Sequence, residues 1–420
     1  MKWILSTFFV LLIIGLYAQD QPKKIIFTET NYDSIREAYI NEKFEKNKDL
    51  RDSVRLQLKT IKADSVFNLK ISNYYFKEMP NLSGFNALKS ISADNNSIEF
   101  VKKSQFRSDS LVLVKITGSQ INKISFSKNK SIKIINLSSN KLKRIPYSIH
   151  KLKNLETLTL SNNNIKRVPR FIRRLKNLKE IDLSGNKIEL NKSSIRRIKN
   201  IENVLLANNN IDQLPENVAQ MVNVKRLNLA GNELSELPSG FDELKNLKQI
   251  IFYKNKFTHI PPQIFELNGL TEIDFYYNEI SNIPDGVGNL IKLEQLFLSH
   301  NNISRLNDTI KYLKQLRYLF IHHNNLVVIP AWIVDLKELE RLDVGYNHLF
   351  EIPDLSLLGK LTDIDLQSNN IENFPWSIID NEELNLFLID DNPLILTKDE
   401  REELKVITQK YEKKGVRFSF

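Results

Sequence analysis

Apolar residues recur along most of this chain with a fixed period. The segment that begins at Leu155 reads LETLTLSNNNIKRVPRFIRRLKN, and the segment that begins at Leu178 reads LKEIDLSGNKIELNKSSIRRIKN. Two later segments keep the same order of apolar and polar positions: VKRLNLAGNELSELPSGFDELKN from Val224 and LTEIDFYYNEISNIPDGVGNLIK from Leu270. Their common pattern is LxxLxLxxNxLxxLPxxIxxLxx, with a period of 23 residues. Self-similarity at a period of this length is typical of a repeat architecture.

An asparagine at the ninth position of this pattern sets the register of the repeats. It recurs every 23 residues from Asn140 to Asn347, and it reaches Asn392 after one shorter unit of 22 residues. In this register 15 units run from Val66 to Leu394, and ten of the 13 prolines lie six residues after the asparagine position. The three earliest units are less regular and carry Tyr74, Asn96 and Ser119 at this position.

Each part of the repeat predicts a different local structure. The LxLxx alternation has period two and predicts a short strand with its leucines on one face. The PxxIxxL part has helix-like spacing, so the returning arm should direct its apolar residues to the same core. The asparagine should satisfy backbone groups at the sharp turn after the strand. Because strands occupy less width than returning arms, the stacked units should curve, with a parallel sheet on the concave side.

This pattern resembles the leucine-rich-repeat family, in the LPxxIxxL version seen in many soluble interaction proteins, and the chain is similar to secreted bacterial proteins of that kind. The resemblance covers nearly all of the chain after its first residues. It implies an α/β solenoid, a curved horseshoe with a parallel concave sheet and helical end caps. The motif is highly specific for this fold, but it names neither a partner nor an oligomeric state.

The first residues are typical of a targeting signal. Lys2 is followed by an apolar run from Trp3 to Leu16, and Ala18 precedes a polar break. This order predicts a cleavable signal peptide over residues 1–18. The apolar run is about 14 residues long, whereas a membrane span needs about 20, so an uncleaved anchor is the less favoured alternative. We therefore expect a secreted or periplasmic protein without a membrane span.

The segments on either side of the repeats should cover the open ends of the core. Residues 19–65 are expected to form an N-terminal helical cap, in which Ser34 and Glu37 have the spacing of a capping box. Residues 66–394 hold the repeats, about 15 units, and residues 395–420 are expected to form a C-terminal cap. Thr397 and Glu400 repeat the capping-box spacing there, and Gly415 is the expected stop of the helix.

The composition excludes several kinds of chemistry. The chain contains no cysteine, which removes thiol nucleophiles, disulfides and zinc–thiolate sites. It also lacks a phosphate-binding loop, a dinucleotide-binding fingerprint and a zinc-protease motif. The repeat register places Ser299 beside His322, but an open sheet offers this pair no evident orienting acid, oxyanion hole or sheltered pocket. We therefore expect no enzymatic activity and no cofactor.

Side chains at positions three, five, seven and eight of the repeat should face the concave solvent. Earlier strands carry small polar residues at these positions, such as Thr157, Thr159 and Ser161. Five consecutive later strands carry large rings there instead, with Ile251 beside them. We call these rings the aromatic zone: Tyr253, Tyr276, Tyr277, Phe297, His300, Tyr318, Phe320, His322, His323 and Tyr346.

Acidic residues border the aromatic zone, and Arg341 is the main cation among them. Large exposed aromatic patches on proteins usually mark binding sites, and tyrosine-rich surfaces supply contact area at low entropic cost. We predict that the aromatic zone binds a protein or peptide together with Arg341 and Asp343. The alternative is that stacked rings only stabilise neighbouring strands, which would scatter them along the whole sheet. The bordering acids are Glu272 and Asp274 on one side, and Asp343, Asp363, Asp365, Asp390 and Asp391 on the other.

The aromatic zone also contains histidines at spacings that suit a metal ion. His300 and His323 should lie about 5 Å apart on adjacent strands, so the two imidazoles could share an ion. Pairs of histidines without an assured third ligand are more often ordinary surface residues. We therefore expect no metal.

Positive charge gathers in one part of the chain. The net charge is +10, and residues 141–199 contain 17 Lys or Arg against four acidic residues. This basic block predicts, as an alternative function, binding of an anionic polysaccharide or cell-surface polymer. A simpler explanation is a solvated face, since many of its arginines lie on returning arms. They include Arg170, Arg173, Arg174, Arg196 and Arg197. Because we expect secretion, we expect no nucleic-acid partner.

Overall fold

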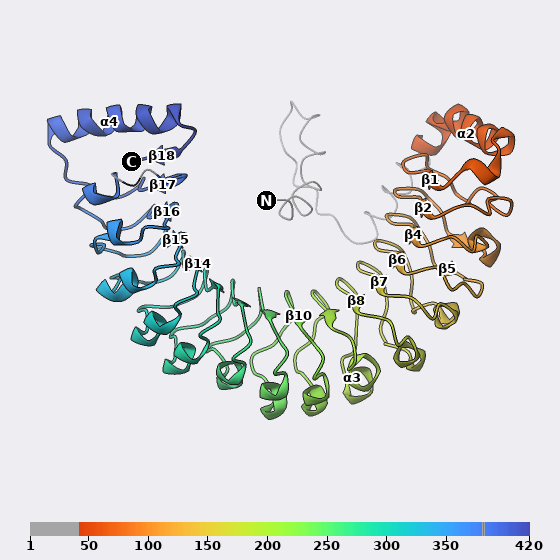
Figure 1. Cartoon of the computed structure of the whole chain (residues 1–420), viewed down its shortest axis with the longest axis horizontal. Helices are drawn as coiled ribbons and strands as arrows, with labels where there is room; N and C mark the ends of the chain where they lie inside the picture. Colours follow the sequence, from red (N-terminus) through yellow and green to blue (C-terminus); the bar gives the residue numbers. More distant parts are fainter. Residues whose placement is uncertain (1–41, 380, 382) are drawn as a thin grey trace, which may run out of the picture.

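The computed structural model describes residues 42–379, 381 and 383–420, which form one curved solenoid. Figure 1 shows a horseshoe in which the strands line the inner edge and the short helices form the outer edge. The predicted parallel concave sheet is therefore confirmed. The expected signal peptide at residues 1–18 and the capping box at Ser34 and Glu37 lie outside the described residues.

The concave sheet has 16 parallel strands, each bonded to the strand of the next unit. Fifteen of them occupy positions three to five of the repeats, so residues one period apart pair directly, as Phe297 does with Phe320. The strands are β1 (Asn68–Lys70), β2 (Ser90–Ser92), β4 (Leu113–Lys115), β6 (Ile134–Asn136), β7 (Thr157–Thr159), β8 (Glu180–Asp182), β9 (Asn203–Leu205), β10 (Arg226–Asn228), β11 (Gln249–Ile251), β12 (Glu272–Asp274), β13 (Gln295–Phe297), β14 (Tyr318–Phe320), β15 (Arg341–Asp343), β16 (Asp363–Asp365), β17 (Leu386–Leu388) and β18 (Arg417–Ser419).

The returning arms form short 3₁₀ helices in most units, and a proline, which lacks a backbone N–H and suits the start of a helix, directly precedes most of them. In the unit that carries Lys192 instead of proline, Asn191 caps the backbone N–H groups of Ser193 and Ser194, and a true α-helix follows, α3 (Lys192–Ile198). The 3₁₀ helices are η1 (Ala63–Ser65), η2 (Lys103–Phe106), η3 (Tyr147–Lys151), η4 (Arg170–Arg174), η5 (Glu216–Gln220), η6 (Ser239–Glu243), η7 (Pro262–Glu266), η8 (Asp285–Asn289), η9 (Asp308–Tyr312), η10 (Ala331–Asp335), η11 (Leu355–Leu357) and η12 (Trp376–Ile378).

A helix lies at each end of the stack. At the first end, α2 (Lys48–Thr60) packs Val54 and Leu58 against the core. At the other end, α4 (Lys398–Lys413) begins at the predicted capping box of Thr397 and Glu400, which is confirmed. After α4 the chain adds β18 to the sheet, a strand that the repeat pattern did not predict.

Two strands of two residues make a second, short sheet away from the concave face: β3 (Phe100–Val101) pairs with β5 (Lys123–Ile124). Within the described residues, no helix is both long enough and apolar enough to cross a membrane.

The core runs the length of the solenoid as a single apolar layer between sheet and arms. Buried leucine and isoleucine side chains supply most of it, from Leu69 near α2 to Phe418 near α4. Each unit buries its apolar face only by stacking on its neighbours, so the stability of the fold is spread along the chain.

Buried asparagines tie each turn to the preceding unit. In one such unit, the Asn301 side-chain amide donates to the carbonyls of Phe275 and Leu298, each at 2.9 Å, and of Ser299 at 3.2 Å. Its side-chain oxygen accepts from the backbone N–H of Ile280 at 2.9 Å. The same pattern recurs through Asn140, Asn163, Asn186, Asn209, Asn232, Asn255, Asn278, Asn324, Asn347, Asn369 and Asn392.

Replacing Asn301 by alanine should destabilise the solenoid by roughly 2 to 4 kcal/mol, because it leaves buried backbone groups without partners. The measurement is the urea midpoint followed by circular dichroism. Asn302→Ala is the matched control, since Asn302 is exposed and its one bond, to the carbonyl of Glu279, is long at 3.5 Å. Equal midpoints for the two variants would show that the buried asparagines are not essential.

Candidate functional site

The structure brings the rings of the aromatic zone together on the concave face. Its members come from the strands β13 and β14 and from the turns that follow β11 to β15, and they form four rows that run across the strands. Position three contributes Tyr318, and position five contributes Phe297 and Phe320. Position seven contributes Tyr253, Tyr276 and His322, and position eight contributes Tyr277, His300, His323 and Tyr346.

The position-eight row is a continuous stack of four rings. Tyr277 stacks on His300 at 4.0 Å between ring centroids, His300 stacks on His323 at 4.0 Å, and His323 stacks on Tyr346 at 4.2 Å. Tyr277 and Tyr346 at its two ends are 43% and 46% exposed, so the stack borders solvent.

All four residues of this stack adopt left-handed backbone conformations, with φ between 51° and 56°. Position eight of other repeats holds Asn162, Gly185, Asn208 and Gly231 in the same conformation, and also Ser139, Lys254, Ser368 and Asp391. Asparagine and glycine tolerate this region, whereas a bulky ring there is strained. The rings therefore occupy the turn at a conformational cost relative to the glycine and asparagine of other units.

In the position-seven row, two large side chains meet across a serine that lies between them. Tyr253 stacks on Tyr276 at 5.6 Å, and the Tyr276 hydroxyl lies 3.1 Å from Nε2 of His322, two units away. The unit between them carries Ser299, which is fully buried and not exposed as the pattern predicted. Its hydroxyl has no hydrogen-bond partner among the described residues. The expected exposed Ser299–His322 pair is therefore wrong, because the larger side chains on both sides meet across the serine.

The position-five row is apolar in the middle and acidic at both ends. Phe297 and Phe320 stack at 4.9 Å, and the Arg341 guanidinium lies 5.0 Å from the Phe320 ring centroid. Asp274 pairs in register with Phe297, and Asp343 pairs with Phe320. Asp343 was expected at the exposed border, but it is only 7% exposed. Its short side chain sits lower than the neighbouring rings.

Burial changes the protonation of the acids in this row. It raises the pKa of Asp274 to about 7, against the opposing effect of a hydrogen bond from the Tyr276 backbone N–H. Burial, with a further contribution from Asp365, raises the pKa of Asp343 to about 7, against the opposing charge of Arg341. Both carboxyls therefore sit near half-protonation at neutral pH, and a cationic partner group would favour their charged form.

The position-three ring is held by an ion pair that the repeat pattern does not reveal. Tyr318 donates its hydroxyl hydrogen to Glu340 at 2.9 Å, and Arg317 binds the same carboxylate through two nitrogens at 2.7 and 2.9 Å. Arg317 and Glu340 lie at position two, which the column assignment did not include. Their signal in the sequence is only that the two opposite charges are one period apart.

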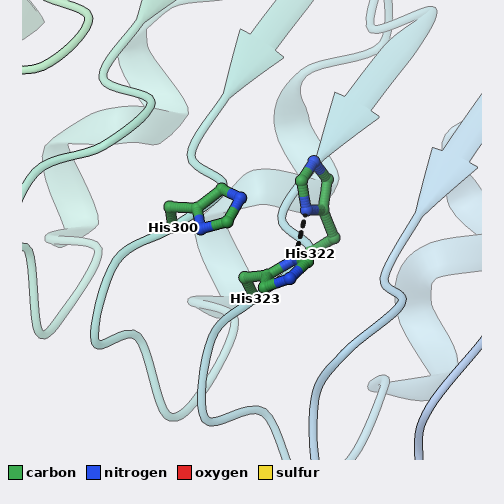
Figure 2. Close-up of side chains that lie close together, drawn as sticks. All are labelled: His300, His322 and His323. Atoms are coloured by element: carbon green, nitrogen blue, oxygen red, sulfur yellow. Dashed lines mark hydrogen bonds between the residues drawn. The ribbon is translucent and has the colours of Figure 1, made fainter. Parts of the chain in front are cut away.

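Three histidines converge at the middle of this stack, two from the stack itself and one from position seven. Ligand atoms of His300, His322 and His323 all lie within 4.8 Å of one another, and Figure 2 shows their rings facing a common space. Nδ1 of His322 lies 2.8 Å from Nδ1 of His323. Burial lowers the pKa of His322 to about 4, helped by His323 and His300. The sequence indicated only the His300–His323 pair, because position seven was assigned to a separate row.

The basic block forms a hollow outside the concave sheet. Its volume is about 1280 Å³, and its lining includes nine Lys or Arg and one acid, Glu189. Tyr147, which is 67% exposed, and Phe171 lie in the same wall and contact edge to face. Two of these cations are engaged: Arg197 is half-buried and donates to the Val168 carbonyl, and Arg167 pairs with Glu189 at 3.4 Å.

The raised pKa values predict a pH-dependent stability. The folded protein holds the Asp274 proton more tightly than the unfolded chain, in which the carboxyl pKa is about 3.9. Protonated Asp274 therefore contributes fully to the free energy of unfolding below about pH 4, and this contribution is lost as the pH rises through about 7. The free energy of unfolding of Asp274→Asn, measured relative to that of the native protein, should therefore increase by roughly 2 to 4 kcal/mol when the pH is raised from 5 to 8. Urea unfolding at both pH values measures this difference.

Asparagine preserves the local structure at this position, since Asn228 accepts the same backbone hydrogen bond in its own unit at 3.0 Å. The control is Asp182→Asn, which makes the same change in the same row outside the aromatic zone. If the two variants showed identical pH profiles, the environment of Asp274 would not be the cause.

Comparison with known proteins identifies the repeats. The Leucine rich repeat family model matches residues 109–165, 130–188, 253–303 and 291–349. A search of curated proteins found no significant match. Among solved structures, a leucine-rich-repeat protein of Leptospira interrogans aligns with a TM-score of 0.71 and 26% identity, over 86% of this chain and 97% of its own.

Two further structures share the fold. An internalin of Listeria monocytogenes aligns with a TM-score of 0.57 and 19% identity, over 86% of this chain and 93% of its own. A TDR receptor aligns with a TM-score of 0.60 and 27% identity, over 78% of this chain and 60% of its own. The asparagine-bonded turns, the parallel concave sheet and these matches lead to one conclusion: residues 109–188 and 253–349 are leucine-rich repeats, and the chain has the leucine-rich-repeat fold.

Proposed function

We propose that this chain is a non-enzymatic recognition module that binds a protein or peptide on the aromatic zone, outside the cytoplasm. The signal-like order of its first residues supports the location. Curved solenoids present extended concave surfaces that bind macromolecules, which supports the general mode. The similarity to a TDR receptor, a protein named for a receptor function, agrees with this proposal.

The position-eight stack is the observation that carries the proposal. A non-glycine residue held in a left-handed conformation costs about 1 kcal/mol or more, whereas a cross-strand ring pair returns about 0.2 to 1 kcal/mol. Four consecutive rings in this conformation therefore gain little stability over the glycine or small polar residue that position eight holds in most other units. Because the conformational cost is about as large as the gain from ring pairing, a role in binding explains the four rings better than a role in stabilising neighbouring strands.

The electrostatics of the zone indicate the chemistry of the partner. The paired rings of Phe297 and Phe320 offer an apolar floor, and Asp274 and Asp343 lie at its two ends. A segment that seats an apolar side chain on the floor and places Lys or Arg near these carboxyls would bury area and restore their charge. We therefore propose a partner with apolar side chains flanked by basic ones.

Replacing Phe297 and Phe320 together by alanine should weaken partner binding by about 2 kcal/mol or more, because buried ring contacts usually dominate such interfaces. The test is affinity for a partner recovered by pull-down from the native surroundings, beside thermal melting of the same variant. The buried leucines of β13 and β14 are untouched, so melting should change little.

Thr157→Ala with Thr159→Ala is the matched control, since these residues occupy positions three and five of β7 outside the aromatic zone. If both double variants bound equally well, the zone would not be the binding site. A collapse in the melting temperature of the phenylalanine variant alone would place these rings in the core.

The hollow of the basic block supports a second candidate function, the binding of an anionic polymer. Nine cations and the exposed ring of Tyr147 in the same wall provide charge and contact area for sulfated or phosphorylated chains. This site is separate from the aromatic zone, so the two functions are compatible.

Reversing Arg170 and Arg174 to glutamate should lower the salt concentration at which the protein leaves a heparin column, because both are exposed cations lining the hollow. Lys292→Glu with Arg305→Glu changes the net charge equally at exposed sites outside the block. Equal elution of the two variants would show that retention reflects overall charge and not the hollow.

A further inference from the structure

The histidine cluster, defined by His300, His322 and His323, joins three potential metal ligands from two adjacent units. His322 and His323 follow each other in the turn after β14, and His300 lies in the turn after β13. The left-handed backbone at His300 and His323 directs both rings to the same row, and His322 turns toward them from position seven. The hydrogen-bond ladder between the units fixes these backbones before any ion arrives.

The geometry of the three rings suits a common ion. One ring nitrogen from each histidine lies within 4.8 Å of the other two, and the lone pair of such a nitrogen is what binds a metal ion.

We propose that His300, His322 and His323 bind a divalent transition-metal ion of the Zn²⁺ class on the concave face. Three imidazoles suit zinc, copper or nickel, whereas magnesium and calcium prefer oxygen ligands. His323 is exposed, so the remaining coordination position is open to solvent, and water completes a tetrahedral zinc ion there.

The surroundings of the cluster fit this assignment. When His322 coordinates through Nδ1, its Nε2 carries the proton and donates to the Tyr276 hydroxyl oxygen, 3.1 Å away. Such a second partner fixes the orientation of a metal-bound histidine and commonly contributes to affinity. Tyr277 and Tyr346 flank His300 and His323 in the stack, which limits the motion of both rings.

Only small movements of the rings would form the site. Two nitrogens bound to one zinc ion lie roughly 3.3 Å apart, given bonds of about 2.0 to 2.1 Å and tetrahedral angles. One ring nitrogen from each histidine lies within 4.8 Å of the other two, and the Nδ1 atoms of His322 and His323 are already 2.8 Å apart. Tilting the stacked rings of His300 and His323 toward His322 closes the remaining gap.

The chain itself supplies conservative substitutions for the test. Asparagine occupies position eight at Asn162 and Asn208 in the same left-handed conformation, so His300→Asn and His323→Asn should preserve the turns. Glutamine occupies position seven at Gln367, so His322→Gln is the matching change. His259→Asn removes an exposed histidine outside the cluster and serves as the control.

The experiment titrates Zn²⁺ alone into the protein without a histidine tag, by calorimetry, and repeats it with Co²⁺, whose visible absorption reports tetrahedral coordination. Mg²⁺ is the negative probe. We expect one ion per chain and a rise in melting temperature, since an ion that binds only the folded state stabilises it. Each single cluster variant should bind at least about tenfold more weakly, and His259→Asn should bind like the native protein.

Two results would overturn the proposal. One is native protein that binds Zn²⁺ no more tightly than the triple cluster variant, provided that the variant melts like the native protein. The other is native protein that binds Co²⁺ without showing a tetrahedral spectrum, or with a tetrahedral spectrum that the cluster variants also show. Because the probe is the metal alone, neither result depends on whether the aromatic zone binds a protein partner.

Discussion

The asparagine side chain at the ninth position of most repeats makes the interaction on which the rest of this structure depends. Its amide donates to carbonyls of its own turn and of the preceding unit, and its oxygen accepts a backbone N–H from that unit. A sharp turn inside a protein otherwise leaves such groups unpaired, at about 1 to 3 kcal/mol each. The asparagine therefore makes the turn possible, and the turn sets the stacking of the sheet and the position of every exposed column.

A scaffold fixed in this way leaves the exposed columns free to vary. Positions three, five, seven and eight contribute little to the core, so β7 can carry threonines there and β14 can carry Tyr318 and Phe320 without a change of fold. A binding surface is then determined by which side chains occupy these positions in adjacent units. The aromatic zone shows this clearly, because its rows join residues that are one or two periods apart in the chain.

Packing among these free positions changes their chemistry. The rings that cover Asp274 and Asp343 remove water from both carboxyls and raise each pKa to about 7. A surface built from ordinary residues therefore presents two carboxyls that are about half-protonated near pH 7, and this property supports the proposed partner chemistry. The proposed metal site depends on packing too, because neighbouring units bring the nitrogens of three histidines within 4.8 Å.

The period of 23 determined, by itself, the repeat register, the parallel sheet, the concave side and the gathering of the rings, because each follows from regular spacing that every unit repeats. Tertiary structure decided what depends on the sizes of side chains in adjacent units. Ser299 is buried because Tyr276 and His322 meet across it, and Asp343 is buried beside larger rings. The ring of His322 contacts Tyr276 through Nε2 and faces His323 in the neighbouring row through Nδ1. The strand β18 after α4 also lay beyond the pattern, since that segment pairs with β17 without carrying the repeat. The repeat period predicts where the backbone of each unit lies, whereas the positions of exposed side chains depend on packing between neighbouring units.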